Sequence, residues 1–219
     1  MNATPLLPEW ITQAKIEKYE TAHVLVECET RLYGTEDLYG DWDARALLLA
    51  KDFSSSEDFR SRIDAKDPRP YRHDPKCLTN KRLRRFAGAL AASSDPSSCG
   101  LLYGSALANL LRGDGRMSGP LPNWENALLH GVRVLSFVRE SMPNLRTLVC
   151  MGWEAYAVTQ EGFKLGHRWD EVKHAGRVLS ADGLRIVVVP HPAARGPLAA
   201  QESAWEKARA VVAQEGGRD

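Results

Sequence analysis

The sequence predicts an α/β protein, a three-layer αβα sandwich with a central, mostly parallel four-stranded sheet. Two observations predict this fold. Four short, nearly continuous apolar runs recur along the chain, as in strands buried on both faces, and segments with helical spacing of apolar residues separate them. A chain of 219 residues with 43% hydrophobic residues can bury one sizeable core, so we expect a single domain over residues 1–219.

The first half of the chain contains one predicted strand between two predicted helices. Residues 9–29 carry apolar residues at helical spacing, and the apolar run 46–50 breaks into charge as a buried strand does at its end. The polar segment 54–77 contains three prolines and predicts a long ordered loop. A basic helix follows it, with Thr79 or Asn80 as the expected N-cap.

The second half continues the alternation of strand and helix. A strand is predicted within 100–106, and the apolar spacing across 123–142 predicts a helix. The next strand turns at Gly152 into another helix. The dipeptide Asp182-Gly183 is a hairpin signal that leads into the last core strand, and the final helix is expected to begin at Ser203 and to end at the glycines 216–217.

Charge and cysteine content limit the possible partners. The net charge is +1, so an anionic partner would have to meet a local basic patch rather than the field of the whole molecule. The four cysteines form no CxxC pair, so we expect reduced thiols and no metal or iron–sulfur site. No long apolar run, signal peptide or lipidation motif is visible, which favours a soluble, cytoplasmic protein, and we expect a monomer.

The residues that follow the predicted strands are the first candidates for a site, because ligands bind at the carboxyl ends of parallel strands. Two of these strand ends carry titratable groups suited to chemistry. Asp52 supplies a carboxylate after the first strand, and His191 supplies an imidazole after the last. The backbone of His191 is stiffened by Pro190 and Pro192, which favours a histidine with a fixed direction.

Four segments, in order along the chain, resemble a divergent member of the uracil-DNA glycosylase superfamily. They read LLLAKDFSSS, LLYGSALANLLR, PNLRTLVCMGWEAYAV and VVVPHPAARG, and the resemblance covers residues 40–212. In that superfamily the first strand ends in a Gly-Gln-Asp-Pro-Tyr or Gly-Glu-x-Pro-Gly motif, and the last ends in His-Pro-Ser. The corresponding stretches here are AKDFS and HPAAR. The resemblance implies the superfamily fold and a monofunctional hydrolase that removes uracil from DNA in base excision repair.

The implied chemistry suits the two titratable residues. Cleaving an N-glycosidic bond builds positive charge on the sugar and negative charge on the departing base. By resemblance, Asp52 supplies the anion and holds the attacking water, while His191 donates to the uracil O2. No cofactor is implied, and Lys51 is interpreted as a backbone-positioning or phosphate-side residue rather than as a nucleophile.

The resemblance also implies contacts to the base and to DNA. The flipped base needs an aromatic ring to stack on, and we prefer Tyr71 to Phe53. The base-binding candidates are Lys51, Phe53, Tyr71, Ser105 and Asn109. The loop after His191 would enter the duplex and the basic helix would contact phosphates, which gives the DNA-binding candidates Ser54, Lys81, Arg82, Arg85, Pro192, Ala193, Ala194 and Arg195.

The sequence departs from the superfamily pattern at the residues that read the base. Relatives strict for uracil carry an asparagine where this chain has Ser105, and a hydroxyl reads less of a base edge than an amide does. Ala50 replaces the first glycine of the motif, Phe53 replaces its proline, and Ala193 replaces the serine of His-Pro-Ser. Either the enzyme also accepts other deaminated bases, such as hypoxanthine or xanthine, or it reads uracil through backbone groups.

Two alternatives to a glycosylase stay open from the sequence. A non-catalytic nucleic-acid-binding protein with a degenerate glycosylase fold is the first, although the retention of both Asp52 and His191 argues against it. An unrelated α/β enzyme acting on free nucleosides or nucleotides is the second. That enzyme would need a glycine loop to cradle phosphate after the first strand, and AKDFSSS contains no glycine.

Overall fold

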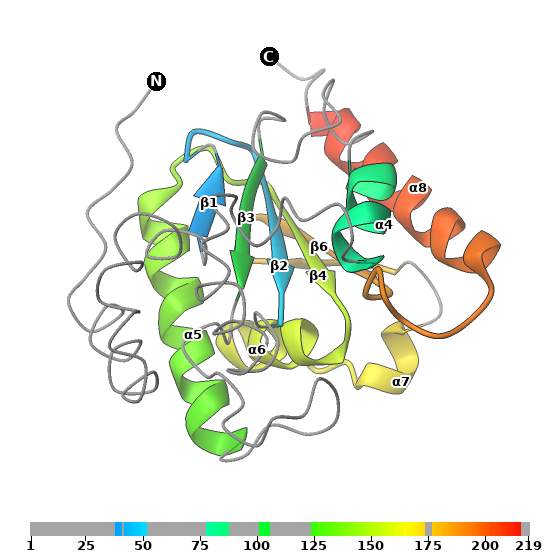
Figure 1. The fold of residues 1–219 in the computed structure, drawn as a ribbon. Coiled ribbons are helices and arrows are strands. Elements are labelled where there is room, and N and C mark those ends of the chain that lie inside the picture. Colours follow the sequence, from blue (N-terminus) through cyan, green and yellow to red (C-terminus); the bar gives the residue numbers. More distant parts are fainter. Residues whose placement is uncertain are drawn as a thin grey trace, which may run out of the picture.

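The computed structural model of the protein describes residues 38–40, 42–51, 78–87, 101–105, 124–173 and 177–215. Helices and strands alternate through these ranges (Figure 1). In chain order they are β1 (Leu38–Gly40), β2 (Ala46–Ala50), α4 (Leu78–Ala87), β3 (Leu101–Ser105), α5 (Trp124–Ser141), β4 (Thr147–Met151), α6 (Trp153–Phe163), α7 (Trp169–Val172), β5 (Val178–Ala181), β6 (Leu184–Val189) and α8 (Leu198–Glu215).

These strands form one sheet with the order β1-β3-β2-β4-β6-β5. The four predicted strands β2, β3, β4 and β6 are confirmed as its parallel centre. The described sheet also has an antiparallel strand at each edge, because β1 pairs with β3 and β5 pairs with β6. The predicted hairpin is confirmed between β5 and β6, where Asp182 and Gly183 both have positive φ, as a tight two-residue turn requires.

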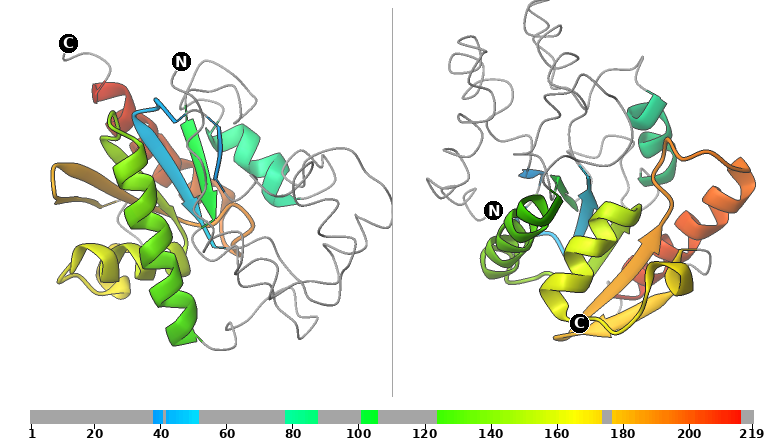
Figure 2. Two further views of the ribbon diagram at one scale, coloured as in Figure 1. Left: turned by 90° about the vertical axis from the view of Figure 1, so that its left-hand side faces the viewer. Right: turned by 90° about the horizontal axis from the view of Figure 1, so that it is seen from below.

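Two hydrophobic clusters lie on opposite faces of the sheet, because successive side chains of a strand point to opposite sides. Leu47 and Leu49 of β2 pack into one cluster with residues of α5, α6 and α7. Ala46 and Leu48 of β2 pack into the other with residues of α4 and α8, including Trp205. Figures 1 and 2 show α5 on one side of the sheet and α4 with α8 on the other. Helices therefore cover both faces of the parallel centre.

The helices differ from the prediction at the beginnings of α4 and α8 and in one additional short helix. Thr79 and Asn80 lie inside α4, which begins at Leu78, so neither is the N-cap. Helix α8 begins at Leu198, before the predicted Ser203, and extends to Glu215. The single-turn helix α7 was not predicted, because four residues are too short to show an apolar period. The predicted helix 9–29, the loop 54–77 and the glycines 216–217 lie outside the described residues.

In the ranges that the structure describes, no helix has the length and apolar character needed to cross a membrane.

Candidate functional site

The parallel strands end at one edge of the sheet, where the sequence predicts a site. Ala50 lies opposite Ser105, and Met151 lies opposite Val189, so the strand ends are level with one another. Strand β2, the first of the four along the chain, lies between β3 and β4. The chain therefore passes from β2 to β3 on one side and then crosses back to β4 on the other, and open α/β sheets bind ligands at such a switch point. The residues that end or follow the four strands are Lys51, Ser105, Gly152 and His191.

Gly152 and His191 lie in direct contact across the ends of β4 and β6. The Gly152 amide donates a hydrogen bond to the carbonyl of Val189 at 2.9 Å. A Cβ atom added at Gly152 would lie 3.4 Å from the Cβ of His191. The backbone of Gly152 has φ 91° and ψ −179°, a conformation that is essentially restricted to glycine. This glycine begins α6 and lets the histidine lie close against the turn.

The imidazole of His191 is held in one tautomer by the loop that follows it. The Ala193 amide donates to His191 Nδ1 at 3.2 Å, so Nδ1 accepts and the proton of the neutral ring is on Nε2. The Ala194 amide donates to the His191 carbonyl at 2.7 Å, which closes a tight turn. Burial lowers the pKa of His191 below its usual range, and this effect exceeds the opposing attraction of Glu154. His191 is therefore a neutral ring with a donor at Nε2.

An ion pair lies beside this histidine. Lys51 Nζ, after β2, is 2.7 Å from Glu154 Oε1 in the first turn of α6, and both side chains are mostly buried. The two charges act on His191 in opposite directions, since Glu154 raises its pKa and Lys51 lowers it. Lys51, Glu154 and His191 thus form an edge cluster, drawn from three segments that are distant in the sequence.

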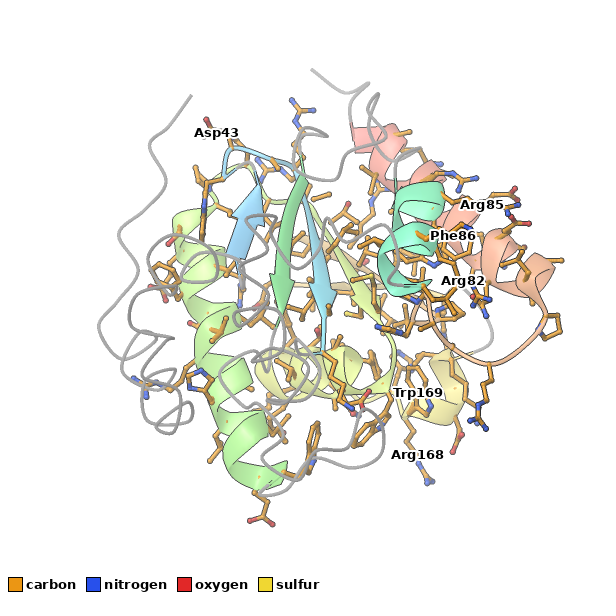
Figure 3. All side chains as sticks on the ribbon, in the orientation of Figure 1. Asp43, Arg82, Arg85, Phe86, Arg168 and Trp169 are labelled. Carbon is orange, nitrogen blue, oxygen red and sulfur yellow. The ribbon has the colours of Figure 1, made fainter. Side chains whose placement is uncertain are left out.

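Two helices hold the loop that follows His191. Arg82 of α4 donates through Nη1 to the Pro192 carbonyl at 3.0 Å. Gln201 of α8 donates through Nε2 to the Ala194 carbonyl at 2.9 Å. Figure 3 shows Arg82 and Arg85 on α4, on the side of the molecule where α8 lies. The loop is therefore held at two carbonyls of its turn, by a long-range contact from α4 and by a nearby contact from α8.

The structure brings together only some of the predicted site residues. Lys51 and His191 lie at the same edge, and Ser105 ends the neighbouring strand β3. Lys81, Arg85, Ala193 and Arg195 are exposed, whereas Pro192 is buried and Arg82 is partly buried against the loop. Arg85 pairs with Glu202 of α8. The predicted site residues outside the described ranges are Asp52, Phe53, Ser54, Tyr71 and Asn109.

Sequence reasoning missed three contributors to this edge. Glu154 and Trp153 follow Gly152 directly, so the rule that located the other strand ends also points to them. Gln201 carries no such signal, because only the folded chain brings α8 against the loop. Within the described ranges, no group of three or more His, Cys, Asp or Glu side chains is arranged to hold a metal ion.

The edge cluster has the chemical properties of a site that stabilises a developing anion. A neutral imidazole with a fixed Nε2 donor stabilises such charge without first giving up a proton. No protein-family model matches this chain, and no curated protein matches it either.

Proposed function

We propose that this protein is a monofunctional DNA glycosylase with a uracil-DNA glycosylase-like fold, which removes uracil from DNA in base excision repair. The observation that carries the proposal is the state of His191. Its Nδ1 accepts the Ala193 amide, so Nε2 is the donor, and burial lowers its pKa and keeps the ring neutral. Uracil leaving a sugar gathers negative charge on O2, which a neutral N–H donor stabilises.

The position of Lys51 also supports the proposal. Lys51 ends the described part of the motif AKDFS and pairs with Glu154, whose charge acts on His191. Asp52, which lies outside the described residues, follows Lys51 in the sequence. The strand that precedes Asp52 in the sequence and the strand that precedes His191 therefore end at one edge of the sheet.

In the proposed reaction a water molecule is the nucleophile and uracil is the leaving group. The bond between uracil N1 and the sugar C1′ breaks, and its electron pair leaves with the base. The Asp52 carboxylate stabilises the positive charge on the sugar and orients the water, whose oxygen bonds to C1′. The water loses one proton to solvent through Asp52, and the uracil anion, held by the His191 Nε2 donor, takes up one proton on release.

A cleavage assay on labelled oligonucleotides tests this function. Each strand carries one uracil, either single-stranded or opposite guanine or adenine, and alkali breaks the abasic sites that form. Parallel strands with hypoxanthine or xanthine define the base range. We expect wild type to release uracil, and Asp52→Asn and His191→Ala to lower the rate by orders of magnitude.

His167→Ala is the matched control for the histidine variant. His167 follows α6 at the end opposite Gly152, and α6 is about 16 Å long at 1.5 Å per residue. Its loss should leave uracil release near the wild-type rate. Release of no base by the folded wild-type protein would overturn the proposal, and DNA binding without release would favour the non-catalytic binding protein.

A further inference from the structure

Two tryptophans stack on each other at the beginnings of two helices. Trp153 is the first residue of α6, and Trp124 is the first residue of α5. Their ring centroids are 4.7 Å apart with an interplanar angle of 27°, a stacked arrangement. We refer to Trp124 and Trp153 as the tryptophan pair.

The outer ring of this pair is exposed to solvent. Trp153 is 41% exposed. The other large hydrophobic residues that are exposed in the described ranges are all aliphatic. Trp124 is partly buried and packs against the core cluster that lies between the sheet and α5 and α6. Trp153 therefore exposes an apolar ring to solvent, and the ring of Trp124, which packs against the core, holds its orientation.

The tryptophan pair adjoins the edge cluster. Trp153 lies between Gly152, which contacts His191, and Glu154, which pairs with Lys51. An exposed tryptophan costs free energy in water, because its large apolar surface is not removed from solvent. A fixed, exposed ring beside a cluster of functional groups suits a planar ligand that covers it.

The proposed function indicates what that ligand is. Flipping a nucleotide out of a strand removes the stacking partner of its neighbours, and this costs free energy. A tryptophan face replaces that partner for any base, since every base has a π-face. We propose that the tryptophan pair is a stacking platform for an unpaired base that neighbours the flipped nucleotide. This inference rests on the proposed function for the identity of the ligand as DNA.

Binding of uracil-free DNA tests the platform without any chemistry. The probes are a short single-stranded thymidine oligonucleotide and an oligonucleotide of the same length made of abasic spacers, which carries the same phosphates but no bases. We expect wild type to bind the thymidine strand about 5- to 100-fold more tightly than the abasic strand, with quenching of tryptophan fluorescence.

Three substitutions at one position separate stacking from apolar contact. Trp153→Leu keeps an apolar side chain and Trp153→Ala removes it, so both should abolish the preference for the thymidine strand, whereas Trp153→Phe should retain most of it. Leu129→Ala, which removes another exposed apolar side chain from α5, is the control and should bind as wild type does. Circular dichroism and unfolding curves verify that each variant is folded.

The outcomes distinguish this inference from the proposed glycosylase activity. If the protein releases no uracil but Trp153→Leu loses the thymidine preference, the platform stands and the proposed chemistry fails. If folded Trp153→Leu keeps the wild-type preference, the platform is overturned, whatever the cleavage assay shows. Equal binding of both strands by wild type, or binding of neither, also overturns it.

Discussion

The backbone of Gly152 lies so close to His191 that a Cβ atom added to the glycine would be 3.4 Å from the histidine Cβ. The glycine has φ 91°, which L-residues with side chains rarely adopt, and its amide donates to the end of β6. This glycine therefore caps the beginning of α6 and also forms the turn against which the proposed catalytic histidine packs. The turn against which His191 lies thus depends on a backbone conformation that favours glycine at residue 152.

We predict that Gly152→Ala lowers the free energy of unfolding by about 1–3 kcal/mol, because the backbone there is strained for any other residue. Uracil release should fall as well, since an alanine would relax the strained turn against which His191 lies. Gly162→Ala is the matched control in the same helix α6, where the added Cβ would meet Leu135 Cδ2 at 3.4 Å. In helical backbone this change should stabilise by up to about 1 kcal/mol. Urea unfolding measures the free energy of unfolding of both variants, and equal changes in Gly152→Ala and Gly162→Ala would contradict the prediction.

The ion pair beside His191 predicts opposite shifts in its titration. Glu154 raises the pKa of His191 and Lys51 lowers it. Glu154→Gln should therefore lower that pKa further, and Lys51→Met should raise it, both by removing a charge and by leaving Glu154 unpaired. Proton NMR of the imidazole signals, assigned with His191→Gln, measures these shifts. Shifts in the same direction for both variants would show that the pair does not act on the ring as the structure indicates.

The depressed pKa of His191 also makes folding stability depend on pH. Its pKa in the folded protein lies below the unfolded value of about 6.5, so the folded state binds fewer protons between the two values. The contribution of this residue to stability is present above the unfolded pKa and is lost as the pH falls through the folded one. His191→Gln should therefore show a shallower loss of stability over that acidic window in urea unfolding, and an unchanged pH slope would contradict this.

The sequence predicts the parallel centre of the fold because β2, β4 and β6 are mostly buried and each contains a continuous apolar run. The edge strands lack this signal. β1 has three residues, and β5 alternates exposed and buried side chains next to solvent. A continuous apolar run indicates that a strand is buried on both faces. It therefore predicts central strands and does not predict short edge strands, which are partly exposed to solvent.

The candidate site was predictable to the extent that it follows from strand ends. Lys51 comes directly after one apolar run and His191 follows another after Pro190, and the parallel pairing of β2, β4 and β6 brings both strand ends to one edge. The pairing of Lys51 with Glu154 joins positions far apart in the chain, and no local pattern contains it. Arg82 shows the same limit, because a basic helix face predicts solvent or phosphate, whereas its donation to the Pro192 carbonyl depends on how α4 packs.

Cys150 in β4 is predicted to be unreactive in the folded protein. The side chain is fully buried and its Sγ lies 3.2 Å from Thr159 Oγ1, which itself donates to the Ala155 carbonyl. Burial raises the pKa of the Cys150 thiol to about 12, so almost no thiolate forms at neutral pH. Iodoacetamide should label the peptide containing Cys150 only after urea unfolding, as read by mass spectrometry. Rapid labelling under native conditions would mean that β4 is accessible.

Arg82 and Lys81 are neighbours on α4 with the same charge, and the structure predicts different consequences for their loss. Arg82 is partly buried and donates to the Pro192 carbonyl at 3.0 Å, whereas Lys81 is exposed. Arg82→Met should lower the free energy of unfolding by about 1 kcal/mol, because a carbonyl in the loop after His191 loses its donor. It should lower kcat for uracil release more than it changes KM, since the loop then positions His191 less well.

Lys81→Met should leave unfolding and kcat unchanged, and should weaken DNA binding only through the loss of one surface charge. The salt dependence of binding separates the two roles. A residue that contacts phosphate releases a counterion on binding, so its loss reduces the slope of affinity against salt by about one. If Arg82→Met and Lys81→Met reduce that slope equally and leave kcat unchanged, Arg82 acts as a phosphate contact, as the sequence predicts, and does not act by positioning the loop. If only Arg82→Met lowers kcat, α4 contributes to the site by holding the turn that fixes the tautomer of His191.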